Sequence, residues 1–255
     1  WWTARLSRNR CGLRERKREM DSDRKTGIVV GALFIVATAA SILGSVALGS
    51  VLEEPEYLID VAASEGQVIL AVLLFLVAAS SAFATAFLLF PILRRHSEGL
   101  AAGYVGLRGF ENVFYVAGTV GLLTMLTVSQ NSVAGSADLS PMGATLLALH
   151  DWSVLIGTLI FFGLGCLILN YVLYQSGLVP RWLSLWGIVG AVFVFSYGLL
   201  GIFGVDTGLG SPFMLLAMPI ALQEMVFAVW LIAKGFSRPA VQSYQTAEHR
   251  VAAMN

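Results

Sequence analysis

The chain has 255 residues, of which 57% are hydrophobic and only 13% are charged, and its mean hydropathy is +0.77. Soluble domains carry about 25% charged residues, so this composition excludes an ordinary water-soluble protein. The 16 basic and 16 acidic residues balance to a net charge of zero. This balance gives no indication of a nucleic-acid partner, and the lipid bilayer is the expected partner instead.

The first 24 residues form a basic segment. Residues 1–19 contain seven Lys or Arg and no Met, and Met20 follows directly. We interpret Met20 as the natural start; the alternative is that residues 1–24 are a native cytoplasmic arm attracted to anionic lipid head groups. The first apolar run, residues 28–52, is too long for the core of a signal peptide, so no cleavable signal is expected.

Six apolar runs follow, each long enough to cross a bilayer as a helix. About 20 residues at a rise of 1.5 Å cover a hydrocarbon core of roughly 30 Å. The runs lack the alternating pattern of barrel strands, and the connectors are too short for a soluble domain. We therefore predict an all-α membrane protein with six transmembrane helices in one bundle over residues 25–236 and a disordered tail over 237–255. The runs are residues 28–50, 67–90, 106–128, 146–174, 183–204 and 212–233.

The basic residues predict the orientation of these six spans. Lys and Arg resist translocation, so they gather on the cytoplasmic side of a membrane. Alternating the connectors from an inside N-terminus places every Lys and Arg inside, whereas residues 53–65 in the first outer connector contain five acidic residues and no basic one. The prediction is a multi-pass protein of the plasma (cytoplasmic) membrane with both termini in the cytoplasm. The inner basic residues are nine in residues 1–25, then Arg94, Arg95, Arg108, Arg181, Lys234, Arg238 and Arg250.

The second half of the chain contains a recognisable pattern. Residues 161–183 read FFGLGCLILNYVLYQSGLVPRWL, and Glu224 precedes WLIAKGF, residues 230–236, by six positions. Over roughly residues 25–236 the chain resembles the bacterial multi-pass membrane family catalogued as domain of unknown function 4386. The resemblance implies a helical membrane fold and assigns no chemistry, but it directs attention to the charged residues within the spans.

Charged side chains inside the spans are the candidate site residues, because a charge in hydrocarbon is costly and normally faces the bundle interior. Glu224 lies near the middle of the sixth span, ten residues before Lys234. Arg108, Glu111 and Asn112 share one helical face by their spacing of three and four residues. The predicted ligand-binding or ion-binding residues are Glu224, Gln223, Glu111, Arg108, Asn112, Arg181 and Asp151.

Two interpretations of these charged residues stand side by side. In the functional one, Glu224 is a proton or cation site, and Arg108 or Arg181 is its counter-ion or an anion contact. In the structural one, Arg108 and Glu111 form an i,i+3 ion pair at the membrane interface, and Glu224 holds two helices together. Asp151 is either an interfacial polar residue or part of an outward-facing vestibule.

The motif survey disfavours an enzyme. No GxSxG, HExxH, P-loop or GxGxxG sequence stands in a strand-turn-helix context. The three histidines lie on different segments, which indicates neither a zinc site nor a haem, so no metal and no cofactor are expected. Cys11 and Cys166 lie in the basic segment and inside a span, which indicates no disulfide framework.

The sequence predicts an integral membrane protein that binds or moves a small solute or ion through an intrahelical polar cavity centred on Glu224. The alternative is a non-catalytic membrane scaffold or sensor subunit in which the same residues are structural. A membrane enzyme acting on lipid is less favoured, since it needs Arg108, Glu111 and Arg181 to converge at one interface. Glycine-rich faces in the spans are explained by helix packing within one chain or by a homo-oligomer.

Overall fold

The computed structural model of the protein describes residues 2–52, 57–134, 139–207 and 211–237, and its side chains from residue 22 onward apart from residues 50, 133 and 134. These residues form helices joined by turns, and none of the described segments is a strand. The elements are α1 (Trp2–Leu48), η1 (Gly49–Leu52), α2 (Tyr57–Ala63), α3 (Glu65–Leu93), α4 (Glu98–Ala134), α5 (Ser140–Val154), η2 (Leu155–Phe161), α6 (Phe162–Ser176), α7 (Arg181–Ile202), η3 (Pro212–Leu216) and α8 (Met218–Ala233).

Six of the described helical segments are long and apolar enough to cross a membrane, which confirms the predicted fold class. α5, η2 and α6 follow one another without a break and form a single span of 37 residues, in which η2 is π-helical. The predicted tail lies outside the described residues except for Ser237. The six segments are Ser22–Leu48, Glu65–Leu93, Glu98–Ser132, Ser140–Ser176, Arg181–Ile202 and Pro212–Ala233.

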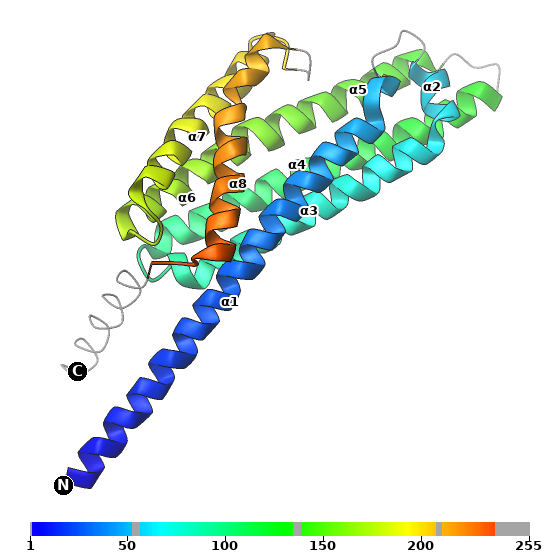
Figure 1. The fold of residues 1–255 in the computed structure, drawn as a ribbon. Coiled ribbons are helices and arrows are strands. Elements are labelled where there is room, and N and C mark those ends of the chain that lie inside the picture. Colours follow the sequence, from blue (N-terminus) through cyan, green and yellow to red (C-terminus); the bar gives the residue numbers. More distant parts are fainter. Residues whose placement is uncertain (1, 53–56, 135–138, 208–210, 238–255) are drawn as a thin grey trace.

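The spans run alternately up and down, so their connectors lie at two opposite ends of the bundle (Figure 1). The turns from α3 to α4 and from α6 to α7 lie at the end where α8 finishes. Arg94 and Arg95 lie in the first of these turns, and Arg181 is the first residue of α7. We call this the basic end. The opposite end contains α2 with Asp60 and the start of α3 with Glu65, and we call it the acidic end. Which end faces the cytoplasm stays a prediction.

Small residues set the closest approaches between helices. α1 packs along α3, α3 along α4, α6 along α7, and α8 lies against both α1 and α7. A Cβ added at Gly190 of α7 would lie 2.9 Å from the backbone nitrogen of Ile220 in α8, and one at Gly31 of α1 would lie 2.6 Å from the carbonyl oxygen of Ala228. Glycines thus pack against neighbouring helices within the chain, between α7 and α8 and between α1 and α8.

α1 is fixed to its neighbours at the basic end by two polar contacts. The Arg24 guanidinium donates hydrogen bonds to the carbonyl oxygens of Leu231 and Ile232 at 2.8 and 2.7 Å, at the end of α8. The Leu231 carbonyl also accepts a hydrogen bond of 3.1 Å from the Gly235 N–H. The last carbonyls of a helix have fewer backbone donors than interior ones, so Arg24 adds donors at the end of α8. Asp23 forms an ion pair of 2.7 Å with Arg95 beside the turn from α3 to α4. The crossing of α1 and α8 is thereby held at this end.

Candidate functional site

A buried arginine joins two glutamates in the middle of the bundle. Arg108 is only 2% exposed, and its Nη1 donates to both carboxylate oxygens of Glu111, at 2.8 and 3.0 Å. Its Nη2 donates to Oε1 of Glu224 at 3.4 Å. Because Arg108 and Glu111 lie on α4 and Glu224 lies on α8, this group of three residues connects two spans. We call it the charged cluster.

The helix that carries Arg108 begins earlier than the predicted apolar run. α4 begins at Glu98, not near residue 106, so Arg108 lies ten residues, or about 15 Å, inside the helix. The predicted i,i+3 pair of Arg108 and Glu111 is present. Its position at the membrane interface, which the structural interpretation expects, stays a prediction.

Uncharged groups complete the surroundings of Arg108. Its guanidinium carbon lies 5.1 Å from the ring centroid of Phe162, 5.8 Å from that of Tyr104 and 6.0 Å from that of Phe34. Its Nε also donates to the Tyr104 hydroxyl at 3.4 Å. Aromatic faces attract cations, so these rings help to stabilise a guanidinium removed from water. Arg108 therefore contacts three aromatic rings in addition to the two carboxylates.

The charged cluster contains one more negative group than positive groups. With both carboxylates ionised, two negative charges face a single guanidinium, and an uncompensated charge in a low-dielectric interior is costly. Glu111 receives two short hydrogen bonds from Arg108, whereas Glu224 receives one long one and a contact from Cys166 Sγ at 3.7 Å. Glu224 is thus the less neutralised carboxylate, where a proton or another cation can balance the charge.

Glu224 is also the most accessible member of the charged cluster. The exposed fraction of the side chain rises from 2% for Arg108 to 7% for Glu111 and 12% for Glu224. All three line a cavity of about 330 Å³, which we call the central cavity. Its other polar lining residues are Thr38, Ser41, Tyr115 and Thr158, and its apolar ones are Phe34, Ala37, Ile42, Ala78, Ala82, Phe162, Met214, Ala217, Met218 and Ala221.

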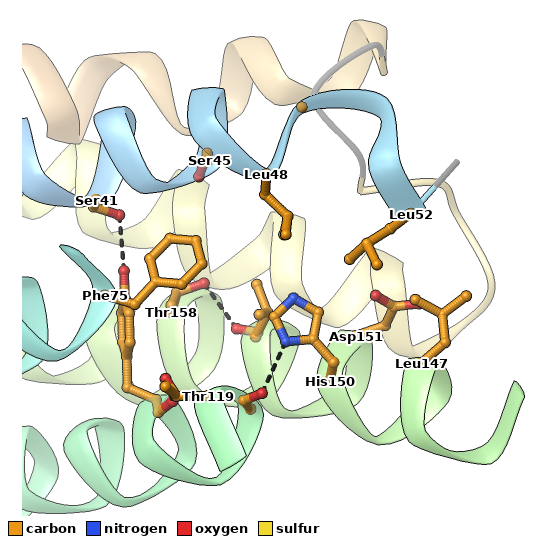
Figure 2. A pocket seen from close by; sticks show the side chains of 14 residues that line it. Ser41, Ser45, Leu48, Leu52, Phe75, Thr119, Leu147, His150, Asp151 and Thr158 are labelled. Atoms are coloured by element: carbon orange, nitrogen blue, oxygen red, sulfur yellow. Dashed lines mark hydrogen bonds between the residues drawn. The ribbon is translucent and has the colours of Figure 1, made fainter. Parts of the chain in front are cut away.

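Figure 2 shows a second cavity, of about 430 Å³. Leu48, Gly49 and Leu52 line it, so it lies toward the acidic end. His150 and Asp151 also line it, and the His150 ring donates a hydrogen bond of 3.1 Å from Nδ1 to the carbonyl oxygen of Gly118. The two cavities share three lining residues, Ser41, Tyr115 and Thr158. The hydroxyls of Ser41 and Tyr115 are hydrogen-bonded at 2.7 Å, so this bond lies in the wall between the cavities.

The remaining predicted site residues are distributed over three other places. Gln223 is buried and donates to Asn170 Oδ1 at 3.1 Å and to the Leu183 carbonyl at 3.4 Å, so it faces α6 and α7 and is not among the lining residues of either cavity. Asn112 is half-buried and lines neither of them. Asp151 is exposed and lines the second cavity, where its side chain is drawn in Figure 2.

Arg181 does not join the charged cluster. It is exposed at the start of α7, with its guanidinium 5.8 Å from the ring centroid of Tyr174. Of the two arginines predicted as a partner of Glu224, Arg108 is the one in contact. The convergence of Arg108, Glu111 and Arg181 that a lipid-acting enzyme was expected to need is therefore not observed.

Two neighbours of the charged cluster were not predicted. Tyr104 lies four residues before Arg108 on the same helical face, and that spacing was a usable signal. Cys166 contacts Glu224 from a different span, and no sequence spacing could have indicated this.

These features define a multi-pass helical membrane protein with a charged cluster buried beside a cavity. The chain belongs to the family described as Domain of unknown function (DUF4386), whose model matches residues 29–235. A search of the curated proteins found no match, and a search of the solved structures found none either.

Proposed function

We propose that this membrane protein binds a small positively charged solute or ion in the central cavity, and that Glu224 is the carboxylate whose charge the ligand balances. The observation that carries the proposal is the position of Glu224, which lines a cavity of about 330 Å³ while receiving only one hydrogen bond of 3.4 Å from Arg108. We place the protein in the plasma (cytoplasmic) membrane with the basic end in the cytoplasm, following the distribution of Lys and Arg.

The charge of the cluster favours a cation over an anion. Arg108 is its single basic residue and is already bonded to Glu111 and Glu224. An anion would have to displace one of these carboxylates and would lie close to both. A cation, or a proton on Glu224, instead compensates the excess negative charge without breaking the bonds between Arg108 and Glu111.

The second cavity supports movement of the ligand as well as binding. It lies between the charged cluster and the acidic end, and Asp151 on its wall is exposed. Ser41, Tyr115 and Thr158 line both cavities, and the hydrogen bond between Ser41 and Tyr115 lies in their shared wall. Rotation of the Tyr115 side chain would join the two cavities, and side-chain rotation of this kind is a small conformational change.

Thermal unfolding of the purified protein in detergent tests the binding proposal. Sodium, potassium, methylammonium and tetramethylammonium chlorides are added at constant ionic strength, and a ligand at 100 times its Kd stabilises the folded state by about 2.7 kcal/mol. We expect at least one of these cations to raise the Tm of the wild-type protein and to have no effect on Glu224→Gln. The control is Glu98→Gln, the same substitution at an exposed carboxylate, which keeps the response.

A scaffold role is the second candidate function, favoured by the two short bonds between Arg108 and Glu111. In that case the charged cluster only fastens α4 to α8. The difference in Tm between the wild type and Glu224→Gln would then be the same with or without each cation. That result for all four cations would contradict the binding proposal and favour the scaffold.

A further inference from the structure

We propose that the ligand is an amphiphilic monocation, with one positive group on an apolar body, and that it reaches the central cavity from the bilayer through an opening between α1 and α8. This inference rests on the proposed function, because it takes Glu224 as the partner of the positive group. It adds the class of ligand and the route by which the ligand arrives.

The opening is indicated by lining residues that also lie on the outside of the bundle. Ile42 of α1 is 58% exposed and Met218 of α8 is 42% exposed, and Ala221 of α8 is exposed too. All three line the central cavity. At this depth in a membrane the outer surface of a spanning helix faces hydrocarbon, so a cavity that shares its wall with that surface opens sideways into lipid.

The opening results from the way α1 and α8 cross. Near the basic end they are in contact at Gly31 and Ala228, and the rings of Phe34 and Phe227 meet edge to face with centroids 5.6 Å apart. Beyond these residues the two helices diverge toward the acidic end (Figure 1). The central cavity occupies the wedge between them, with Phe34 among the residues that line it.

The lining of the wedge has the chemistry of an amphiphile's binding site. Ten of its residues are apolar, and the two carboxylates of the charged cluster are its acidic groups. A fully hydrated cation would leave the apolar walls without contacts, whereas an apolar body fills them while the positive group lies at Glu224. Met214 and Met218 on the α8 side are flexible and polarizable, which suits apolar bodies of differing shape.

Binding to the protein in phospholipid nanodiscs tests the class of ligand. The probe is radiolabelled octyltrimethylammonium, corrected for partition into nanodiscs without protein, and the comparisons are tetramethylammonium and octanol as competitors. We expect saturable binding of one octyltrimethylammonium per chain, weakened about tenfold or more in Glu224→Gln, where the charged partner is lost. Octanol, which has the chain without the charge, should compete at least about tenfold less well.

Bulky substitutions at the opening test the route. Ala221→Trp and Ile42→Trp fill the opening from opposite walls and should each weaken octyltrimethylammonium binding about tenfold, the cost of overlap in a packed site. Leu222→Trp is the matched control, because Leu222 lies beside Ala221, is 52% exposed and is not among the cavity-lining residues. This variant should bind like the wild type. Each variant is first checked for an unchanged elution volume, so that a folding defect is recognised.

Four results would overturn the inference. Equal binding of tetramethylammonium, with no effect of either tryptophan at the opening, would show that the cation arrives from water, and the proposed function would stand. Equal competition by octanol would show that an uncharged chain fills the wedge. A shift from dimer to monomer in Ala221→Trp would show that a second copy of the chain covers the opening. Binding of both cations that is unaffected by Glu224→Gln would remove the inference and the proposed function together.

Discussion

Arg108 and Glu224 are 116 residues apart in the chain, and their side chains meet at 3.4 Å inside the bundle. The contact joins the third span to the sixth and leaves one carboxylate of the charged cluster only partly compensated. A buried arginine of this kind is tolerated only while its partners remain, since desolvation of an ion costs several kcal/mol. The charged cluster is therefore expected to respond strongly to the loss of one member.

Substitution of Arg108 by Met is expected to destabilise the protein by about 3–5 kcal/mol, because Glu111 and Glu224 lose their counter-ion inside the bundle. The readout is the free energy of unfolding in mixed detergent micelles. The triple variant Arg108→Met, Glu111→Leu, Glu224→Leu removes all charge and should be at least as stable as the wild type. A triple variant that is less stable than Arg108→Met alone would contradict this account of the charged cluster.

Gly190 is expected to tolerate no side chain. A Cβ there would lie 2.9 Å from the backbone nitrogen of Ile220, and backbone cannot rotate away, so Gly190→Ala should cost about 1–3 kcal/mol. Gly106 offers a matched control in another span, since a Cβ there meets no atom within 4 Å. Gly106→Ala should keep or raise the Tm measured by tryptophan fluorescence. Equal Tm values for the two variants would show that α7 and α8 do not pack as described.

Arg24 is expected to contribute to stability through the end of α8. Arg24→Ala removes the hydrogen bonds to the carbonyl oxygens of Leu231 and Ile232, for a loss of about 1–2 kcal/mol at this half-buried position. Lys25→Ala, at the next and exposed position, should change the free energy of unfolding by less than about 0.5 kcal/mol. Chemical denaturation in detergent measures both, and a larger effect of Lys25→Ala would speak against the Arg24 contacts.

The orientation of the bundle is expected to follow the basic residues. In a chain with Cys11→Ser and Cys166→Ser, single cysteines are introduced as Glu65→Cys at the acidic end and Glu98→Cys at the basic end, both exposed positions. A membrane-impermeant maleimide should label the first in intact cells and the second only after the cells are opened. The reverse pattern would invert the predicted topology.

The number and positions of the spans could be predicted from the sequence because they follow from apolar runs long enough to cross hydrocarbon. The pairing of Arg108 with Glu111 was also predictable, since i and i+3 side chains lie on one helical face. The choice between Arg108 and Arg181 as the partner of Glu224 could not be predicted from the sequence. It depends on which helices lie side by side, and six apolar helices can pack in many arrangements with similar hydropathy.

A polar cavity centred on Glu224 was predicted, whereas the start of α4 and the second cavity were not. The predicted run begins at residue 106, but α4 begins at Glu98 and includes residues 98–105, so Arg108 lies ten residues inside the helix. The central cavity lies where α1 and α8 diverge beyond Phe34 and Phe227, a matter of crossing geometry that hydropathy does not record.

η2 gives the 37-residue span a property that an uninterrupted α-helix would not have. A π-helical turn accommodates an additional residue and so changes the angular register between the parts of a helix before and after it. His150 in α5 can therefore face Gly118 of α4 while Cys166 in α6 faces Glu224 of α8. Deleting one residue from η2 would turn one part against the other by about 100°. An insertion or deletion in η2 would therefore rotate α6 relative to α5. Different side chains of the span would then face the charged cluster, although no residue of α5 or α6 had been substituted.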